Sequence, residues 1–377
     1  MLYGFSHAVK RNQPGQTGRL LYMILCLMMF VSLTVSAKAE EAFVPVSASV
    51  IGVDQFGDVM LDLKEIDLEY GDSVNVSFSG GYEIKKIPYY SDFYGFRSSV
   101  VISDQFDTIC LGGIGYNFNN SAGIKEGETA RITLEQKGRY KKEYEAYNIN
   151  NARIRMEDQS NQEFLNFREI TAGQIKGKRL YRGPSPFDPE FHRVELMEQY
   201  IREKNIKCVL DLADNQEKLK SYNNLPDYTS SMISNGQVIP CAIGVDYLEP
   251  KAMDTLGRGL AEMTEKDGPY LIQCSFGRDR TGVICAVIES LCGAEYQEII
   301  EDYMLSYDML HSINMNPESL QYKLFKHRID ELLGAVFGID TAKLPESDLQ
   351  TSAADYLKRC GMTQEQVEKL KDKLTRD

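Results

Sequence analysis

The segment at residues 274–282, with the sequence CSFGRDRTG, constrains the fold of this chain more than any other stretch. The apolar residues 270–273 before it predict a buried strand, and the apolar run 283–291 after it predicts a helix. The segment is therefore expected to be a turn from a strand into a helix. In such a turn the backbone N–H groups of residues 275–280 can point at one centre, and the unpaired N–H groups of the following helix add positive potential. This arrangement predicts a binding site for a dianion.

The residue types in this segment fit the transfer of a phosphoryl group through a thiol. A positive centre favours the thiolate of Cys274, which is the nucleophilic form. Arg280 can hold two oxygens of the transferred group with its planar fork, which a lysine cannot do. Thr281 can hydrogen-bond the sulfur when it leaves the phosphoenzyme. The other residues expected to bind substrate are Ser275, Phe276, Gly277, Arg278 and Asp279.

The spacing Cys-x5-Arg-Thr of Cys274, Arg280 and Thr281 resembles the signature of the cysteine-dependent tyrosine and dual-specificity phosphatases. The form Gly-Arg-Asp-Arg-Thr-Gly at residues 277–282 is most similar to the bacterial tyrosine phosphatase branch that also accepts phosphoinositides. The resemblance implies an exported phosphomonoester hydrolase that forms a phosphocysteine and acts on phosphotyrosine proteins or phosphoinositides. One residue departs from the family: Gln273 stands where a histidine usually precedes the cysteine, and a neutral amide stabilises a thiolate less well.

Two alternative functions remain open at this point. Secreted phytases are built on the same loop, so the substrate can instead be an inositol polyphosphate. The other alternative is a phosphate-binding or adhesion module with little turnover, and Gln273 is the feature that supports it.

Asp246 is the predicted general acid. It lies 28 residues before Cys274, on a loop between the predicted strand at 237–243 and a helix that starts near Pro250, where related phosphatases carry this aspartate. A placed acid is needed because an alkoxide or phenoxide leaves poorly without a proton, and it accelerates the step by about 10²- to 10⁴-fold. The alternative is that Asp246 only caps the helix. The competing acids are Asp214, Asp254 and Asp279.

Three arginines near the loop each have two interpretations. Arg278 either forms a salt bridge with a neighbouring carboxylate or extends the positive field toward a second phosphate. Arg168 and Arg182 lie in the motifs NFR and LYRG, which resemble opening landmarks of the same phosphatase branch. They are either substrate contacts or, as we favour, members of buried ion pairs.

Residues 159–377 alternate between strand-like and helix-like patterns, which predicts an α/β fold with a central, mostly parallel sheet. The resemblance implies the fold of the protein tyrosine phosphatases for this part. Residues 40–158 show period-two alternation between Gly and Asp turns, notably at 44–53, 73–78 and 131–134, which predicts a small all-β accessory domain. Its task is open, with contact to a cell surface as one possibility. The polar stretch at 137–162 shows no periodic apolar pattern and is the expected junction.

Residues 1–39 have the order of a secretory signal. Three basic residues precede the apolar stretch 20–35, and small residues follow up to Ala39. The alternative is an uncleaved membrane anchor. Both predict that the protein is secreted or lies outside the cytoplasm.

The net charge of −13 makes the protein a poor partner for nucleic acid or for an anionic membrane surface. The four histidines have no metal-ligand spacing. We therefore predict no metal and no cofactor, with phosphorylated proteins, phosphoinositides or inositol phosphates as partners.

Overall fold

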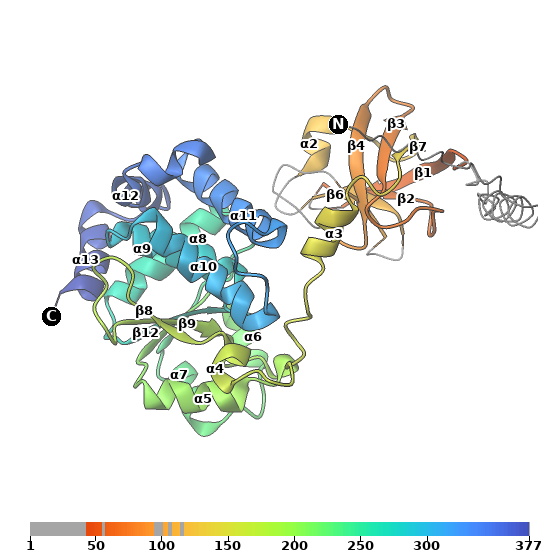
Figure 1. Ribbon diagram of the computed structural model, residues 1–377. Coiled ribbons are helices and arrows are strands. Elements are labelled where there is room, and N and C mark those ends of the chain that lie inside the picture. The colour runs from red at the N-terminus through yellow and green to blue at the C-terminus, as the bar shows by residue number, and fades with distance from the viewer. Residues whose placement is uncertain (1–42, 55–56, 94–100, 105–107, 114–116, 377) are drawn as a thin grey trace, which may run out of the picture. The chain divides into compact units, whose positions relative to one another are not determined.

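The computed structural model describes residues 43–54, 57–93, 101–104, 108–113 and 117–376 (Figure 1). The predicted signal segment at 1–39 lies outside these residues. In the described part of the chain, every helix is too short or too polar to cross a bilayer.

Residues 46–136 form a closed β-barrel with the strand order β1-β2-β6-β5-β4-β3-β7. The strands are β1 (Val46–Val53), β2 (Val59–Leu61), β3 (Ser73–Phe78), β4 (Glu83–Tyr90), β5 (Val101–Ser103), β6 (Cys110–Gly112) and β7 (Thr129–Gln136). Alternate residues such as Val74, Val76 and Ile132 point into the barrel and are fully buried. The predicted all-β domain is confirmed, because its period-two patterns place one face of each strand in this core.

A short helix, α3 (Lys141–Tyr147), follows the barrel within the polar stretch 137–162 that the sequence predicts as the junction. The residues that anchor the helix are tyrosines. Tyr144 stacks on Tyr90 of the barrel, while Tyr147 packs edge-on against Phe325 of α11 (Leu320–Phe337). Aromatic residues at helical spacing carry these contacts, and a search for aliphatic periodicity does not detect them.

The C-terminal part contains a five-stranded sheet with the order β11-β10-β12-β9-β8. The strands are β8 (Arg168–Ile170), β9 (Leu180–Pro184), β10 (Cys208–Asp211), β11 (Val238–Pro240) and β12 (Tyr270–Cys274). All neighbouring pairs are parallel except β8 and β9. The predicted α/β fold with a mostly parallel sheet, preceded by an all-β domain, is confirmed.

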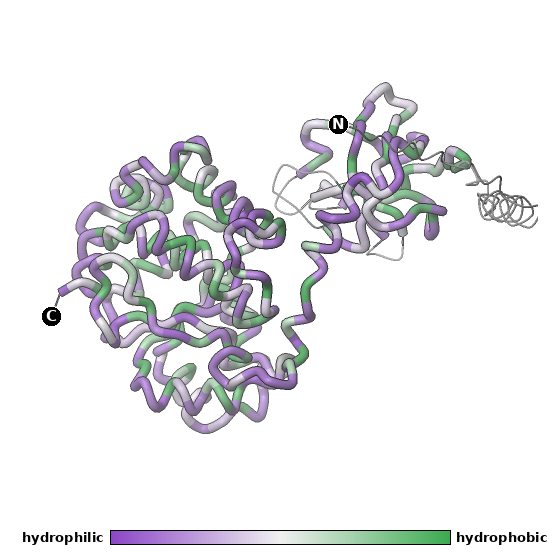
Figure 2. The backbone as a smooth tube through the Cα atoms, in the orientation of Figure 1, coloured by the Kyte–Doolittle hydropathy of each residue, from purple (hydrophilic) through white to green (hydrophobic). Residues whose placement is uncertain are grey.

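Helices cover both faces of this sheet (Figure 1). Tyr270 and Ile272 of β12 belong to the core on one face, and Leu271 belongs to the core on the other. Both faces of a parallel strand are buried in this way, so its sequence is mostly apolar, with Gln273 as the polar exception in β12. The hydrophobic residues accordingly concentrate in the interior of this part of the chain (Figure 2).

The helices of the C-terminal part follow the predicted order. They are α4 (Asn161–Leu165), α5 (Val194–Glu203), α6 (Gln216–Ser221), α7 (Asp227–Ser234), α8 (Pro250–Thr264), α9 (Asp279–Leu291), α10 (Tyr296–His311), α11 (Leu320–Phe337), α12 (Leu349–Arg359) and α13 (Gln364–Thr375). Residues 189–204 are amphipathic and follow Asp188, a good N-cap, with proline at the first position, so the sequence predicts one helix over 189–204. This prediction is wrong. Asp188 instead caps a 3-10 turn at Pro189–Phe191, and His192 then adopts a left-handed conformation with φ of 53°, so the α-helix starts only at Val194.

Candidate active site

The predicted loop connects β12 to α9, as the sequence pattern indicated. Cys274 is the last residue of β12 and is 3% exposed. Gly277 adopts a φ of +65°, and a Cβ atom there would lie 2.3 Å from the carbonyl oxygen of Gly183 at the end of β9. Only glycine meets both conditions without strain. The sharp turn and the close approach of β9 therefore fix the loop against the sheet.

The carbonyl groups of the loop are held from its outer side. The Nδ2 of Asn166 donates to the carbonyl oxygens of Phe276, at 3.2 Å, and Gly277, at 2.9 Å. The Nη2 of Arg182 donates to the carbonyl oxygens of Gly277, at 2.9 Å, and Arg278, at 3.3 Å. A trans peptide unit directs its C=O and N–H groups to opposite sides. The next three N–H groups, of residues 277–279, therefore point toward the inside of the loop, where an anion would bind.

Asp302 on α10 positions the arginine that holds these carbonyls. It forms ion pairs with Arg182 and, at 2.7 Å, with Arg168. Arg182 is fully buried and Arg168 is 7% exposed, so the ion-pair interpretation of both arginines is correct. Burial alone would raise the pKa of Asp302, but the two guanidinium groups hold it well below its ordinary value. The carboxylate thus stays ionised and orients both arginines.

Arg280 spans the carboxyl ends of two neighbouring strands. Its Nη1 donates to the carbonyl oxygens of Leu212, at 3.1 Å, and Ile243, at 3.3 Å, and its Nη2 donates to Oγ of Ser275 at 3.0 Å. Both carbonyls follow strands of the parallel sheet, β10 and β11. These contacts fix the guanidinium beside the loop that Cys274 begins. The role of Arg280 in holding a phosphoryl group stays a prediction.

Asp246 lies on the loop after β11 and is partly exposed. Its Oδ1 accepts a hydrogen bond from the backbone N–H of Leu248 at 3.1 Å. The residue that caps α8 is Glu249, whose carboxylate accepts from the N–H groups of Lys251 and Ala252. The alternative that Asp246 caps the helix is therefore wrong, and its assignment as general acid remains a prediction.

The competing acids occupy different environments. Asp254 is an exposed residue of α8 paired with Arg258. Asp214 follows β10, and its Oδ2 accepts a hydrogen bond from the hydroxyl of Tyr222 at 3.0 Å. Burial raises the pKa of Asp214, which favours the protonated form that a general acid needs. Asp214 is therefore the strongest competitor of Asp246.

Two predicted contributors to the reactivity of the thiol are buried without partners. The hydroxyl of Thr281 and both polar atoms of the Gln273 side chain make no hydrogen bond to any residue that the structure describes. Gln273 is fully buried beneath the loop. The side-chain amide of Gln273 therefore gives the sulfur of Cys274 no hydrogen bond. This agrees with the expectation that Gln273 stabilises the thiolate less well than a histidine would.

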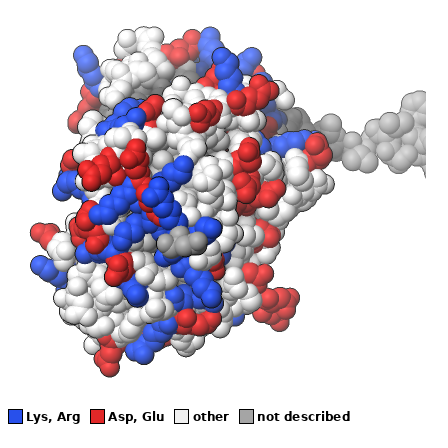
Figure 3. Space-filling model, turned by 90° about the vertical axis from the view of Figure 1, so that its left-hand side faces the viewer, with Lys and Arg blue, Asp and Glu red and all other residues white. Residues whose placement is uncertain are grey.

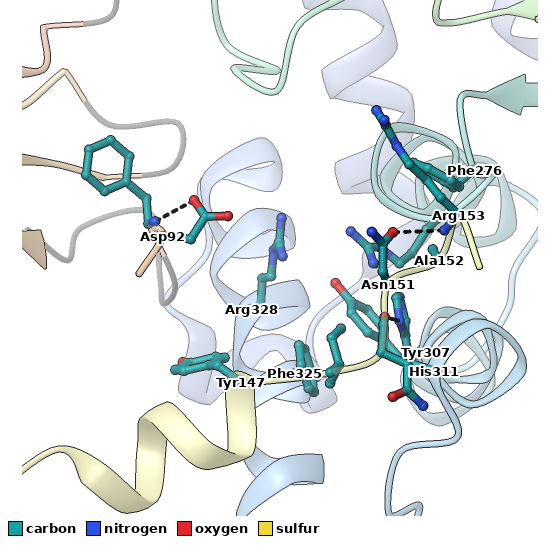
Figure 4. A pocket seen from close by; sticks show the side chains of 14 residues that line it. Asp92, Tyr147, Asn151, Ala152, Arg153, Phe276, Tyr307, His311, Phe325 and Arg328 are labelled. Carbon is teal, nitrogen blue, oxygen red and sulfur yellow. Dashed lines mark hydrogen bonds between the residues drawn. The ribbon is translucent and has the colours of Figure 1, made fainter. Parts of the chain in front are cut away.

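Arg278 lines a pocket beside the loop together with Phe276, Tyr307 and His311 (Figure 4). It also forms an ion pair with Asp279. The Nε and Nη2 of Arg278 donate to Oδ2 of Asp279 at 3.1 and 2.9 Å. Its Nη1 donates to Nε2 of His311, whose Nδ1 therefore carries the ring proton and donates to the carbonyl oxygen of Asn150. Arg328 on α11 approaches the other oxygen of Asp279 at 3.4 Å. The salt-bridge interpretation of Arg278 is the one that the structure shows.

Several residues of this site were not identified as such from the sequence. Asn166 was noticed only as part of a motif, while Arg328, Tyr307 and His311 were assigned no role. They come from α10, α11 and the end of α4, far from the loop in sequence. In the described part of the chain, no three His, Cys, Asp or Glu side chains gather as metal ligands.

A second groove lies away from the loop. Four basic residues line it together with three acidic ones: Arg179, Lys369, Lys373, Arg376, Glu365, Glu368 and Asp372. Arg179 directly precedes β9, so the groove is at the sheet edge opposite to the one where β12 ends at Cys274. Figure 3 shows Lys and Arg side chains interleaved with Asp and Glu on one face of the molecule. The groove thus takes no part in the chemistry of the loop.

Comparison with known proteins identifies the C-terminal part. Residues 160–376 match the model of the "Tyrosine phosphatase family". No curated protein matches the chain.

Three solved structures are similar at low scores. TpbA of P. aeruginosa has a TM-score of 0.26 and 17% identity, over 50% of this chain and 93% of that protein. The core catalytic domain of the PP-IP phosphatase SIW14 of S. cerevisiae has a TM-score of 0.25 and 14% identity, over 48% and 92%. An uncharacterised conserved protein of Thermotoga maritima has a TM-score of 0.22 and 19% identity, over 26% of this chain and only 40% of that protein. Such scores assign no function.

Replacing Asn166 with Ala is expected to weaken the binding of inorganic phosphate by about tenfold. The substitution removes two hydrogen bonds that orient loop carbonyls, and each contributes roughly 0.5–1.5 kcal/mol. Isothermal titration calorimetry measures the affinity, and denaturant unfolding at the same pH separates it from lost stability. Asn223→Ala, on an exposed loop, is the matched control. Unchanged phosphate affinity in a folded Asn166→Ala protein would contradict the role of this amide.

The stability of the protein is expected to depend on His311 between pH 7 and pH 4. Burial, together with the charge of Arg278, lowers the pKa of His311 from 6.5 to about 4. The folded state therefore favours the neutral ring. This stabilisation is complete above pH 6.5 and is lost as the pH falls toward 4, because the unfolded chain binds the proton first.

The expected loss is roughly 3 kcal/mol, and His311→Gln should not show it. The measurement is the free energy of unfolding of both proteins in denaturant across this pH range. Parallel curves for the two proteins would mean that His311 titrates normally.

Proposed function

Because the chain belongs to the tyrosine phosphatase family, a family of cysteine-dependent phosphatases, we propose that it hydrolyses phosphomonoesters through a phosphocysteine on Cys274. Phosphotyrosine proteins and phosphoinositides are the proposed substrates. The observation that carries the proposal is the loop itself. Asn166 and Arg182 hold the carbonyls of residues 276–278, so the N–H groups of residues 277–279 point to the opposite side of the backbone, and this supports the proposed anion site.

The first chemical step forms a bond between the sulfur of Cys274 and phosphorus while the ester P–O bond breaks. The N–H groups of the loop and the guanidinium of Arg280 stabilise the charge on the equatorial oxygens. Asp246 donates a proton to the leaving oxygen. In the second step water attacks the phosphocysteine, Asp246 accepts its proton, and the S–P bond breaks to release phosphate. Arg278 is bound to Asp279 and His311, so it contributes to this site through its charge.

Hydrolysis of an inositol polyphosphate is the second candidate, and one observation favours it. Arg278 and Arg328 both approach the carboxylate of Asp279, and the pocket beside the loop is lined by three arginines and one acid, Asp92, within an acidic protein. A substrate with more than one phosphate matches this distribution.

We also propose that the protein is exported, with residues 1–39 as a secretory signal or a membrane anchor. The order of basic, apolar and small residues supports this proposal. We further propose that the β-barrel contacts a cell surface, because an exported protein would meet one.

Replacing Cys274 with Ser should reduce the hydrolysis of p-nitrophenyl phosphate by more than about a thousandfold, because the hydroxyl stays protonated and is a far weaker nucleophile. Cys360→Ala, which also replaces a buried cysteine, is the control and should retain activity. Release of p-nitrophenol at equal rates by the wild type and Cys274→Ser would exclude the proposed enzyme. It would favour the phosphate-binding module.

Replacing Asp246 with Asn should slow poor leaving groups far more than good ones. A general acid matters most when the leaving oxygen is basic, so kcat for phenyl phosphate should fall by about 10²- to 10⁴-fold and kcat for p-nitrophenyl phosphate much less. Asp214→Asn is the matched comparison. Equal slowing of both substrates by Asp246→Asn, with selective slowing by Asp214→Asn, would transfer the role to Asp214.

A further inference from the structure

Arg328 is a largely buried guanidinium with few partners beside the catalytic loop. Its side chain is 20% exposed, and its Nη2 lies 3.4 Å from Oδ1 of Asp279. None of the described residues accepts a hydrogen bond from it. A guanidinium carries five N–H donors and keeps its charge. Burying this guanidinium with one carboxylate nearby and no hydrogen-bond acceptor among the described residues costs free energy, and a bound anion would offset that cost.

The carboxylate of Asp279 is already occupied by another arginine. Arg278 donates to its Oδ2 through two nitrogens, and the hydroxyl of Tyr307 donates to its Oδ1 at 3.3 Å. Burial would raise the pKa of Asp279, but Arg278 and Arg328 hold it well below its ordinary value. Two permanent cations therefore share this one anion, and the pocket itself is lined by three arginines, Arg153, Arg278 and Arg328, and one acid, Asp92.

The pocket that Arg328 lines also borders the catalytic loop. Phe276 and Arg278 of the loop line it, and so does the segment at 149–153 (Figure 4). His311 and Arg193 hold this segment in place by donating to the carbonyl oxygens of Asn150 and Ala152. The segment precedes residue 160, where the match to the phosphatase family begins. One wall of the pocket is thus a feature of this chain outside the family domain.

Arg328 and the reacting groups act on a common neighbour. Burial raises the pKa of Tyr247, and the charges of Arg328 and Asp279 also influence it. The side chains of Cys274 and Arg280 also lie within electrostatic range of this hydroxyl. The two sets of groups therefore lie within electrostatic range of one side chain.

We propose that Arg328, Arg278 and residues 149–153 form a second anion-binding site beside the catalytic loop, which takes a second phosphate group of the substrate. This inference rests on the proposed hydrolysis at Cys274 and narrows its substrate. Asp279 is the first residue of α9 and belongs to the loop, so the two phosphates have to lie close together. Phosphates on one small ring meet this condition, as in an inositol bisphosphate, free or as a lipid headgroup. The net charge of −13 disfavours an anionic membrane, so the free form should be the better substrate.

The first test compares substrates with one and two phosphates. Arg328→Gln should lose about 10- to 100-fold more kcat/KM on inositol bisphosphate than on p-nitrophenyl phosphate, which corresponds to one charged hydrogen-bonding group. Lys323→Gln, an exposed residue of the same helix, should change neither. Equal losses on both substrates would overturn the proposal. Vesicles of phosphatidylcholine with phosphatidylinositol phosphate form a separate arm, which distinguishes the lipid from the soluble source.

The second test uses an exposed residue, so that folding is preserved. Asn151→Asp places a negative charge in the wall of the pocket, and Asn148→Asp adds the same charge in the same segment outside it. In a Cys274→Ser background, calorimetry should show that Asn151→Asp weakens the binding of inositol bisphosphate by about tenfold and that Asn148→Asp does not. Equal weakening of inositol bisphosphate binding by Asn151→Asp and Asn148→Asp would overturn the proposal. Tighter binding of a doubly phosphorylated peptide than of inositol bisphosphate would also overturn it.

The two tests separate the second site from the proposed function. If the wild type hydrolyses none of these substrates, the proposed function is wrong. The binding measurements then still decide whether the second anion site exists.

Discussion

The catalytic loop depends on the hydrogen bonds between a buried arginine and its backbone. Arg182 reaches from β9 to two loop carbonyls, and the ionised carboxylate of Asp302 holds it there. With these carbonyls held, the N–H groups of residues 277–279 point to the opposite side of the backbone, where the proposed anion site lies. Buried charged groups need partners of this kind, although the Nε of Arg182 makes no hydrogen bond to a described residue. The chemistry of Cys274 thus relies on an ion pair that touches neither the sulfur nor the substrate.

The parallel sheet explains why the other groups of the site meet at the loop. In a parallel sheet the carboxyl ends of neighbouring strands lie along one edge, where ligands bind. Arg280 makes its contacts with the carbonyls that follow β10 and β11, and Asp214 and Asp246 lie on the loops after these same strands. Each candidate acid is therefore brought to the edge where Cys274 ends β12. Only kinetics with different leaving groups can choose between them.

Negative charge predominates over the chain as a whole, while positive charge is concentrated at the catalytic loop. The chain as a whole is acidic, yet Arg278 and Arg328 both pair with Asp279 at the loop, and Arg280 lies on the same loop. Such a local excess attracts phosphorylated ligands to one place while the remaining surface repels them. The pocket wall at 149–153 adds a boundary that the phosphatase family domain does not provide. According to these proposals, substrate choice is decided beside the loop and the reaction takes place inside it.

The sequence by itself determined the loop and the strand and helix around it, because residues 270–291 are consecutive and their pattern follows from local geometry. It failed where contacts are tertiary. The helix expected after Asp188 is interrupted at His192, and α3 went unnoticed because tyrosines anchor it. Only the folded chain brings Asn166 and Arg328, more than a hundred residues apart, to either side of one loop. Hydrogen bonds and ion pairs across such distances leave no periodic pattern, so the tertiary structure alone decides them.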